Sequence, residues 1–502
     1  MMRLRDVIAG CRVVQSAGDL ECDVLGIACD SRAVSPGFVF AAIRGFRTDG
    51  NRFALQAIAS GASAVVSVSP PPADVTANIA VGATVAWIQV EDDREALAIL
   101  ASNFYDQPTA KLHAIGITGT NGKTTTTYLV ESILKVAGHP ASVFGTVEYR
   151  GPGFEFVAER TTPEAPELES LFRKVVDGGW KYAVMEVSSH AIDLKRVEGL
   201  HFDVAVFTNL SRDHLDYHKD MRSYFLAKKR LFTGLDGKVP RVMVLNKDDS
   251  QFAELMAIAP SHVISYGIEA DSDVRPSSFK LGWTGIDARF QTPAGEFDVH
   301  SSLMGKPNLY NISAAIGVAL GLGLSVDSVR AGIDQLPVVP GRFEKIPTTQ
   351  AFRVVVDYAH TDDALEKVLE TAREITAGRV IVVFGCAGER DRTKRPLMGN
   401  AAARLSDLAV LTSDNPRGED PMSIIREVEK GLQSVPGANY RSFADRREAI
   451  RFALSSASSD DTVILAGKGH ETYQVIGNQT FDFDDRVVVR ELLDELAAGR
   501  NH

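Results

Sequence analysis

The sequence predicts an α/β protein with three domains, and three observations support this fold class. The chain has 502 residues, and a typical domain has roughly 150 residues, which suggests about three domains. Short apolar runs typical of buried strands alternate with stretches in which apolar residues recur at helical spacing, as in parallel sheets covered by helices. A glycine-rich turn at residues 119–125 joins one predicted strand to a helix, which is typical of a phosphate-binding sheet.

The composition is that of an ordinary globular protein, with 45% hydrophobic and 24% charged residues, and it argues against a disordered or disulfide-rich chain. The 54 basic and 65 acidic residues give a formal net charge of −11, so we expect no nucleic-acid partner. The four cysteines contain no C-x-x-C pair, which favours free thiols over a zinc site. We find no apolar core of a signal peptide and no apolar run of the ~20 residues that span a bilayer. We therefore expect a cytoplasmic protein without a membrane partner.

The first domain is expected at residues 1–108 as a small α/β unit. Apolar runs predict strands at residues 24–28, 38–43 and 64–68, and a helical pattern follows at residues 94–105. The polar segment that ends at Pro108 is expected to be a linker, because proline interrupts helices.

The second domain is expected at residues 109–338 as a P-loop-type parallel sheet. A strand is predicted at residues 112–118, and a helix at residues 124–137 is expected to stop at Gly138. Three more apolar runs that predict buried strands lie at residues 182–187, 203–208 and 241–245. A proline- and glycine-rich stretch at residues 336–341 marks the end of the domain.

The third domain is expected at residues 339–502 as a Rossmann-like unit. Predicted strands at residues 353–357, 379–384, 408–412 and 462–466 are each followed by a helical pattern, the clearest at residues 363–375. Polar segments come directly after these strands. Because ligands bind at the carboxyl ends of parallel strands, we expect the segments to share one edge of the sheet. Their arginines, lysine, histidines and carboxylates suit a zwitterionic ligand. The segments lie at residues 357–360, 385–391, 414–417 and 467–471.

The glycine-rich turn predicts a phosphate-binding loop made of Gly119, Thr120, Asn121, Gly122, Lys123, Thr124 and Thr125. Glycines let backbone N–H groups surround a phosphate, the lysine reaches terminal phosphates, and the threonine hydroxyl can bind Mg²⁺. Ile117 stands where the strict G-x-x-x-x-G-K-[ST] pattern has its first glycine, so the loop is a shortened variant.

Two further features suggest metal ligands. Glu186 ends a predicted strand, where carboxylates commonly reach Mg²⁺ at the mouth of such a sheet. His214 lies in a polar loop that could supply a second ligand, although an ordinary surface or capping role is equally compatible with the residues alone.

A GTPase is an alternative, because Asn246, Lys247, Asp248 and Asp249 match the N-K-x-D pattern that reads guanine. No D-x-x-G switch segment lies between the phosphate loop and this motif. The sequence therefore disfavours a switch GTPase.

Taken together, these residues resemble the Mur ligases, the ATP-dependent amino-acid ligases of peptidoglycan synthesis, which have three domains. The resemblance covers nearly the whole chain. The motifs that carry it are Asp30-Ser31-Arg32, Gly45 with Asp49-Gly50, the loop 119–125, the segments 186–190 and 207–218, Asn308 and Asn311, Gly341-Arg342, 357–360, Lys394-Arg395-Pro396 and 467–471.

Within the family, the segment Asp414-Asn415-Pro416-Arg417 looks like that of the members that add meso-2,6-diaminopimelate to UDP-N-acetylmuramoyl-L-alanyl-D-glutamate. Members that add lysine usually lack this arginine. The chemistry agrees, because diaminopimelate carries a second carboxylate that a guanidinium can bind through two hydrogen bonds. An unpaired buried guanidinium would also disfavour lysine.

The resemblance implies the following roles, residue by residue. Lys123, Glu186, His214 and Lys228 would be catalytic; Thr124 and Glu186 would bind one Mg²⁺, and His214 and Lys228, the latter carbamylated by CO₂, would serve a second metal. ATP would meet the loop 119–125 together with Asn308, Arg342 and Asp357. The UDP substrate would contact Ser31, Arg47, Thr161, Thr162, Ser188 and Arg196. Diaminopimelate would contact Arg390, Asp414, Asn415, Pro416, Arg417, Gly467 and Glu471.

The implied reaction has two steps and uses ATP and Mg²⁺. The D-glutamate carboxylate attacks the γ-phosphate of ATP to give an acyl phosphate, and the amine of diaminopimelate then displaces phosphate. Catalysis is mostly positioning and charge neutralisation, and domain closure is expected because the sites lie on different domains. The partners are small molecules, and we expect a monomer.

Three residues depart from the family pattern, and other functions stay open. Asp362 stands in place of a usual proline, Leu194 in place of a frequent glutamine and Ala387 in place of a frequent glycine. The alternatives are a folylpolyglutamate-synthetase-like ligase, a Mur-ligase paralogue that joins another amino acid, and a nucleotide-binding scaffold without turnover.

Overall fold

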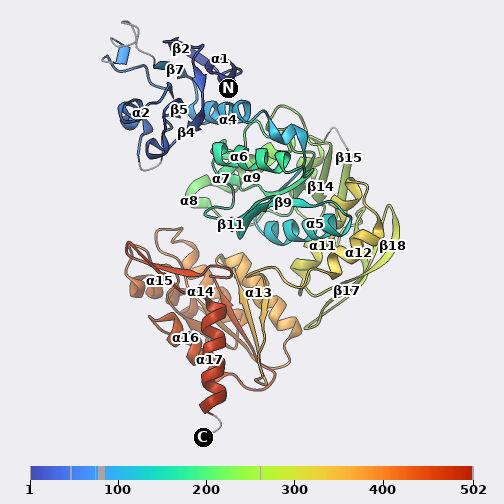
Figure 1. The fold of residues 1–502 in the computed structure, drawn as a ribbon. Helices are drawn as coiled ribbons and strands as arrows, with labels where there is room; N and C mark the ends of the chain where they lie inside the picture. Colours follow the sequence, from blue (N-terminus) through green and yellow to red (C-terminus); the bar gives the residue numbers. More distant parts are fainter. Residues whose placement is uncertain (1, 46–47, 74, 77–84, 260–261, 500–502) are drawn as a thin grey trace.

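The structure is a computed structural model that describes the chain except for residues 1, 46–47, 74, 77–84, 260–261 and 500–502. Three α/β units follow one another along the chain, as Figure 1 shows with the first unit at the top and the third at the bottom. This confirms the predicted fold class. Among the described residues, no helix combines the length and the apolar character needed to cross a membrane.

The first unit is built on a five-stranded sheet in the order β2-β7-β6-β5-β4. Only β2 runs antiparallel to its neighbour. The run predicted as one strand at 24–28 is divided, since Val24 pairs with β1 and the next three-residue strand begins at Gly26. The strands are β1 (Met2–Arg3), β2 (Val13–Ala17), β3 (Asp23–Val24), β4 (Gly26–Ala28), β5 (Phe38–Ala41), β6 (Ala64–Ser67) and β7 (Ala86–Val90), and the helices are α1 (Leu4–Val7), α2 (Ala54–Ala59) and α4 (Asp93–Phe104).

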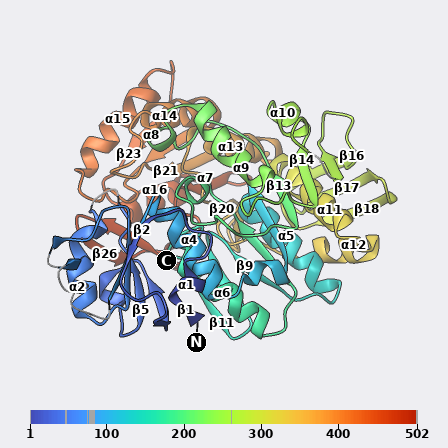
Figure 2. The ribbon, with the colours of Figure 1, turned by 90° about the horizontal axis from the view of Figure 1, so that it is seen from above.

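The helix α4, the last helix of the first unit, packs against the second unit. It begins after Asp92, whose side chain accepts the backbone N–H of Glu95 as an N-cap. Figure 2 shows α4 beside α6 of the second unit, with which it packs. The ammonium of Lys195 also donates to the Asp92 carboxylate over 2.8 Å. The two units are therefore joined by helix packing and by an ion pair.

The second unit contains an eight-stranded sheet in the order β11-β10-β9-β12-β8-β13-β14-β15, whose last six strands are parallel. A three-stranded antiparallel sheet, β16-β17-β18, follows it in the chain. The strands are β8 (His113–Thr118), β9 (Ala141–Phe144), β10 (Glu148–Gly151), β11 (Phe154–Val157), β12 (Tyr182–Glu186), β13 (Val204–Phe207), β14 (Val242–Asn246), β15 (His262–Tyr266), β16 (Arg275–Gly282), β17 (Gly285–Thr292) and β18 (Gly295–Ser301).

Helices cover both faces of the second sheet, as parallel strands require. Leu129 and Ile133 of α5 lie in one apolar core with Ile312 of α11, while Phe172 of α6 and Phe232 of α9 lie in the core of the opposite face. The helices are α5 (Lys123–Val136), α6 (Ala165–Asp177), α7 (Ser189–Asp193), α8 (Leu215–His218), α9 (Met221–Thr233), α10 (Phe252–Met256), α11 (Lys306–Gly321) and α12 (Val326–Asp334).

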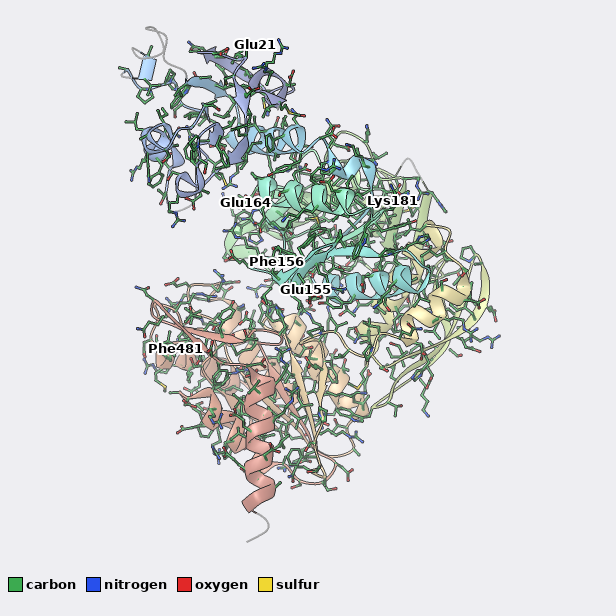
Figure 3. All side chains as sticks on the ribbon, viewed as in Figure 1. Glu21, Glu155, Phe156, Glu164, Lys181 and Phe481 are labelled. Carbon is green, nitrogen blue, oxygen red and sulfur yellow. The ribbon has the colours of Figure 1, made fainter. Side chains whose placement is uncertain are left out.

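The third unit has a six-stranded sheet in the order β19-β20-β24-β21-β22-β23, in which only β19 is antiparallel. The small hairpin β25-β26 follows this sheet. Figure 3 labels Phe481 on that hairpin and Phe156 on β11, two exposed aromatic rings of different units. The strands are β19 (Glu344–Ile346), β20 (Arg353–Asp357), β21 (Val380–Phe384), β22 (Leu408–Leu411), β23 (Tyr440–Ser442), β24 (Thr462–Ala466), β25 (Tyr473–Ile476) and β26 (Gln479–Asp482).

Helices also cover both faces of the third sheet. Leu369 of α13 and Met398 of α14 share a core on one face, and Ile450 of α16 and Val489 of α17 share a core on the other. The helices are α13 (Asp362–Ile375), α14 (Lys394–Leu405), α15 (Pro421–Gln433), α16 (Arg446–Ser456) and α17 (Asp485–Gly499).

A fully buried ion pair holds α16 and α17 together at their first residues. The guanidinium of Arg446 donates to both carboxylate oxygens of Asp485, over 2.8 and 2.6 Å, and also to the carbonyl of Ala466 at the end of β24. Both side chains have no exposed surface. A buried charge that loses its partner is strongly destabilising.

We predict that Arg446→Ala lowers the free energy of unfolding of the third unit by about 3–5 kcal/mol, because it leaves Asp485 buried and unpaired. Urea denaturation, followed by hydrogen exchange of β24, measures the loss. Arg451→Ala is the control, since Arg451 pairs with Glu495 on the surface and should cost less than about 1 kcal/mol. Equal losses in the two variants would contradict this role of the buried pair.

Candidate active site

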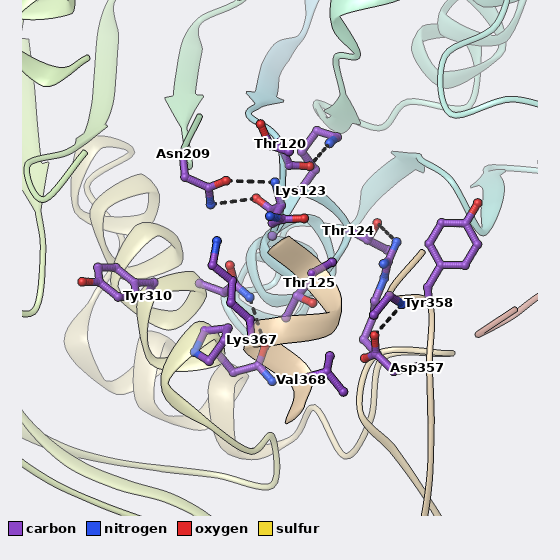
Figure 4. A pocket seen from close by; sticks show the side chains of 18 of the residues that line it. Thr120, Lys123, Thr124, Thr125, Asn209, Tyr310, Asp357, Tyr358, Lys367 and Val368 are labelled. Carbon is purple, nitrogen blue, oxygen red and sulfur yellow. Dashed lines mark hydrogen bonds between the residues drawn. The ribbon is translucent and has the colours of Figure 1, made fainter. Parts of the chain in front are cut away.

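A cavity of about 630 Å³ lies where the second and third units meet, and it contains most of the predicted nucleotide site. Figure 4 shows residues of both units around it, with Lys123 and Thr124 at the start of one helix and Asp357 and Tyr358 across from them. The predicted nucleotide residues on the cavity wall are Thr120, Asn121, Gly122, Lys123, Thr124, Thr125, Asn308, Arg342 and Asp357.

The phosphate loop connects β8 to α5 with the geometry that the sequence predicts. Gly122, the residue before α5, has a left-handed φ of +86°, and a Cβ there would lie 2.3 Å from the Asn311 side-chain oxygen. This close approach requires glycine. The ammonium of Lys123 donates to the carbonyls of Gly119 and Thr120, over 3.0 and 2.8 Å. The lysine is thus folded back along its own loop.

Thr124 and Glu186 lie side by side at the mouth of the second sheet. The Thr124 hydroxyl donates to the Glu186 carboxylate over 3.1 Å and accepts from the guanidinium of Arg342 over 3.0 Å. Glu186 is 1% exposed, and it also accepts from the backbone N–H and the hydroxyl of Thr146, over 2.8 and 3.0 Å. The arrangement presents a hydroxyl and a carboxylate oxygen together, which are hard donors suited to Mg²⁺.

His214 and Lys228 both lie against the ring of Tyr224, and His214 also lines the cavity. The two rings of His214 and Tyr224 have centroids 5.9 Å apart, and the Lys228 ammonium is 4.2 Å from the Tyr224 ring centre. The same ammonium donates to the Gly119 carbonyl over 2.7 Å. Within the part of the chain that the structure describes, no group of three His, Cys, Asp or Glu side chains could hold a metal ion.

Burial controls the charge of these two residues. It lowers the pKa of Lys228 well below the usual value, and the nearby charge of Lys123 lowers it further. Burial also lowers the pKa of His214 to about 3, against the opposing effect of Asp213. His214 is therefore neutral near pH 7, and Lys228 loses its proton more readily than an ordinary lysine.

The third unit closes the cavity through the loop that leads into it and the loop after β20. The Arg342 guanidinium lies 4.8 Å from the centre of the Tyr358 ring. Asp357 accepts the backbone N–H groups of Phe343 and Ala359 over 2.6 and 2.8 Å. Burial raises the pKa of Asp357, while Arg342 counteracts the shift. Asp357 thus holds the two segments together, and Arg342 brings a cation to the phosphate loop.

The residues predicted to bind the UDP substrate are divided between two units. Thr161 and Ser188 line the cavity, Thr162 donates from its hydroxyl to the Glu186 carbonyl over 2.9 Å, and Arg196 donates to the Thr162 carbonyl over 3.2 Å. Ser31 lies in the first unit and bonds to Gln56 there. Arg47 falls outside the described residues.

The residues predicted to bind the amino acid form a second cluster, confined to the third unit. The Lys468 ammonium is fully buried and lies 3.3 Å from the Glu471 carboxylate and 3.7 Å from that of Asp414. Asn415 donates to Glu471 over 3.0 Å. Gly467 precedes this lysine, and a Cβ on it would lie 3.5 Å from an Asp414 carboxylate oxygen.

Arg417, Pro416 and Arg390 lie on two loops that are fastened to each other. The Arg417 guanidinium donates to the Gly388 carbonyl over 2.8 Å. A Cβ on Gly388 would lie 1.9 Å from the Pro416 carbonyl oxygen, so only glycine fits there. Arg390, two residues further on, is exposed. The cluster adjoins the cavity, because the rings of His470 and Tyr358 have centroids 4.9 Å apart.

Comparison with known proteins identifies the family. The models that match are the Mur ligase family catalytic domain at residues 23–105, the Mur ligase middle domain at 117–319, and the Mur ligase glutamate ligase domain at 341–469. A relative from Solibacter usitatus, named UDP-N-acetylmuramoyl-L-alanyl-D-glutamate--2,6-diaminopimelate ligase, is 48% identical over 94% of each chain. The chain belongs to the Mur ligase family. This confirms the resemblance found in the sequence.

Solved structures extend the comparison to the fold. The structure of a UDP-N-acetylmuramoyl-L-alanyl-D-glutamate--2,6-diaminopimelate ligase covers 99% of both chains with a TM-score of 0.68 and 31% identity. Folylpolyglutamate synthase of Mycobacterium tuberculosis covers 73% of this Mur ligase and 91% of its own chain, with a TM-score of 0.58 and 19% identity. The second likeness shows a shared fold alone.

The three departures from the family pattern leave the site intact. Asp362, at the start of α13, lies 3.5 Å from the guanidinium of Arg212. Leu194 follows the last residue of α7, and the Ala387 carbonyl accepts from the buried Arg395. None of the three contacts the residues predicted to be catalytic in the described hydrogen bonds.

The sequence motifs did not predict the role of several residues of the site. Thr146 lies in the turn between β9 and β10, and only its two bonds to Glu186 reveal its place. Lys468 lies within the predicted segment 467–471, but its burial between carboxylates could not be predicted from its position. Asp363, which reaches the phosphate loop from α13, was likewise not predicted.

The acidic residues of the segment 246–249 have structural roles in this fold. Asp249, the aspartate of the N-K-x-D pattern, accepts the backbone N–H of Leu210 over 2.7 Å. The Asp248 carboxylate accepts the backbone N–H groups of Ile268, Glu269 and Ala270 and the hydroxyl of Tyr310, over 2.7 to 3.0 Å. Burial alone would raise the pKa of Asp248, but these hydrogen bonds lower it overall. The carboxylate thus ties the loop after β15 to α11.

We predict that Asp248→Ala lowers the free energy of unfolding by about 1–3 kcal/mol at pH 7, because four donors lose their acceptor. The folded-state pKa is lowered, so the contribution is present above the ordinary aspartate pKa of about 4 and is lost as the pH falls through the lowered value. Urea denaturation at pH 7 and in acid should therefore show a difference that shrinks in acid. A variant with unchanged stability but an altered choice between adenine and guanine nucleotides would contradict this role.

Proposed function

We propose that this Mur ligase adds meso-2,6-diaminopimelate to the D-glutamate of UDP-N-acetylmuramoyl-L-alanyl-D-glutamate at the expense of ATP. The observation that carries the proposal is the cluster of the buried Asp414, Asn415 and Lys468 with the half-buried Glu471, followed along the same segment by Arg417. It offers both charges to a zwitterionic amino acid. The Solibacter usitatus relative, whose name states this reaction, supports the proposal at 48% identity.

We assign one task to each part of the chain. Residues 1–108 would receive the uridine part of the substrate, residues 109–338 ATP, and residues 339–502 the incoming amino acid. The three sheets lie within these ranges. A single chain would hold a complete set of sites, which is compatible with a monomer, and a reaction that consumes ATP is expected in the cytoplasm.

The phosphate loop would hold the phosphates of ATP through its backbone N–H groups and the start of α5. In the structure Lys123 bonds to two loop carbonyls, and the same ammonium would turn to the γ-phosphate when the substrate binds. Arg342, which donates to Thr124, would add a second cation at the transferred phosphoryl group. Asn308 and Asp357 would meet the rest of the nucleotide.

The residues present fit a Mg²⁺ ion at Thr124 and Glu186. Mg²⁺ commonly binds one or two protein oxygens together with substrate phosphates, and the Thr124 hydroxyl and the Glu186 carboxylate are 3.1 Å apart. When bound there, the ion would neutralise charge on the transferred phosphoryl group. Thr146 would keep the carboxylate oriented through its two hydrogen bonds.

Lys228 has the properties needed for carbamylation. A neutral amine attacks the carbon of CO₂, and the product is a carbamate anion and a released proton. Burial lowers the pKa of the Lys228 ammonium, so a larger share of this side chain is the neutral amine than in an ordinary lysine. The carbamate would serve a second metal together with His214, whose ring is neutral.

The two chemical steps would use the two clusters in turn. The D-glutamate carboxylate would attack the γ-phosphorus of ATP, releasing ADP and forming an acyl phosphate, near Lys123 and Arg342. The amine of diaminopimelate, bound by Asn415 and Glu471, would then attack the acyl carbon, so that an amide forms and phosphate and a proton leave. The third unit would carry the amine to the acyl phosphate by closing on the second.

The first prediction of this proposal concerns the substrates. Phosphate release, measured in a coupled assay, should require ATP, UDP-N-acetylmuramoyl-L-alanyl-D-glutamate and meso-diaminopimelate together. Arg417→Ala should raise the KM for diaminopimelate about 10- to 100-fold, the usual effect of losing a hydrogen bond to a charged group, and should leave the KM for ATP nearly unchanged.

Arg426→Ala is a matched control, because Arg426 of α15 is exposed and pairs with Asp420, the residue before this helix. Turnover with L-lysine as fast as with diaminopimelate would rule out the specificity. Product with neither amino acid would favour the paralogue, and an unchanged KM in Arg417→Ala would remove the role of this arginine.

The second prediction concerns Lys228. After incubation with ¹³C-bicarbonate, the wild-type protein should show a carbamate carbon signal by NMR that Lys228→Arg lacks, because a guanidinium cannot be carbamylated. Lys228→Arg should also lose nearly all ligase activity. Lys229→Arg should keep both, since Lys229 pairs with Glu254. A carbamate signal that persists in Lys228→Arg would refute the assignment.

A further inference from the structure

One carboxylate of the third unit reaches directly into the phosphate loop of the second. Asp363 lies in the first turn of α13, and a single oxygen of its side chain accepts three hydrogen bonds. The donors are the side-chain amide of Asn121 over 2.7 Å, the hydroxyl of Ser211 over 2.6 Å and the ammonium of Lys367 over 2.7 Å. Two of these donors belong to the second unit.

Asn121 lies in the phosphate loop, and Ser211 lies on the segment after β13 that is bonded to this loop. Asn121 is in the loop itself, where its backbone N–H donates to the side chain of Asn209 over 2.9 Å. Ser211 follows β13, and its backbone N–H donates to the hydroxyl of Thr120 over 3.0 Å. Asp363 therefore bonds to both segments at the point where they are fastened to each other.

The charge of Asp363 makes these bonds strong and is itself balanced. Hydrogen bonds to an ionised carboxylate are roughly twice as strong as neutral ones. Lys367, one turn further along α13, neutralises the carboxylate at 2.7 Å and also lines the nucleotide cavity. The carboxylate can thus lie beside an anion-binding loop without adding an unbalanced negative charge.

A second set of contacts lies next to the first. The guanidinium of Arg212 donates to the hydroxyl of Thr393, just before α14, over 2.7 Å, and it lies 3.5 Å from Asp362. These contacts are longer or more exposed than those of Asp363. They show that the segment after β13 is held by the starts of two helices of the third unit.

We propose that Asp363 is a positioning residue that docks the third unit on the phosphate loop and thereby orders the loop for the nucleotide. The proposal rests on the proposed function, because it assigns ATP to this loop. Docking and nucleotide binding are then linked, so that each strengthens the other by the same factor. Asp363 acts through Asn121 and Ser211, and it does not touch the reacting atoms.

A merely local role would have different consequences. An aspartate in the first turn of a helix, with a lysine four residues later, also stabilises that helix by itself. Loss of this role would loosen α13 and lower the thermal stability of the third unit. It would not change the order of a loop in the second unit or its response to a nucleotide.

Hydrogen exchange of the full-length protein with and without ADP separates the two roles. In Asp363→Ala without ligand, the amides of residues 119–125 and 208–211 should exchange about tenfold faster than in the wild type, the effect expected when a charge-assisted bond is lost. ADP should slow exchange at the start of α13 in the wild type and not in the variant. The Kd for ADP, measured by calorimetry, should rise about tenfold.

Three further variants serve as controls for the exchange and ADP-binding measurements. Glu366→Ala removes an exposed acid of the same helix that pairs with Arg404 within the third unit, and it should leave exchange and ADP affinity unchanged. Asp363→Asn keeps an acceptor oxygen and should restore part of the affinity. Ser211→Ala should weaken ADP binding less in the Asp363→Ala background than in the wild type, because the two residues share one bond.

Hydrogen exchange and ADP affinity test the docking role of Asp363 even if the chain catalyses a ligase reaction with other substrates. Exchange and ADP affinity need no amino-acid substrate, so a failure of the proposed substrate leaves this test unaffected. In the ligase assay, Asp363→Ala should raise the KM for ATP with a smaller change in kcat. Unchanged exchange at residues 119–125, together with an unchanged Kd for ADP, would overturn the proposal.

Discussion

The structure of the site depends on one buried carboxylate. Glu186 lies at the end of a central parallel strand with almost no exposed surface, where an unpartnered charge would be very costly. Its oxygens therefore accept hydrogen bonds that hold two neighbouring residues in place, Thr124 at the start of α5 and Thr146 in the turn after β9. Arg342 of the third unit then binds the same threonine. One electrostatic requirement thus sets the relative positions of three loops, and it leaves two hard oxygen atoms facing the cavity.

Much of this arrangement could be predicted from local sequence. The strand–loop–helix around Gly122, the strands that end at Glu186 and Asp357, and the helix after Thr361 follow from apolar periodicity and from backbone positions that need glycine. The carboxyl ends of parallel strands meet at one edge, so the motifs after those strands could be expected to meet as well. The family resemblance then supplied the roles that spacing alone leaves open, such as that of Lys228.

What could not be predicted depends on contacts between distant segments. Thr146, Lys468 and Asp363 are ordinary residues in the sequence, and their partners lie 40, 53 and 242 positions away in the chain. Nothing in local spacing shows which unit packs on which, so the bond from Asp363 to the phosphate loop had no signal. The N-K-x-D motif is the opposite case, because it is a clear sequence pattern with a different role in the structure. Its pattern suggested a nucleobase site, whereas its aspartate, Asp249, accepts the backbone N–H groups of Leu210 and Gln251.

The residues that complete the cavity lie in the last third of the chain, so they are synthesised after the phosphate loop. The phosphate loop ends at Thr125, but the cation that meets Thr124 is Arg342, and the far wall extends to Glu374. A chain in synthesis folds its domains in order from the N-terminus. The second unit therefore exists for a time without Arg342, the arginine that contacts Thr124 at the start of α5.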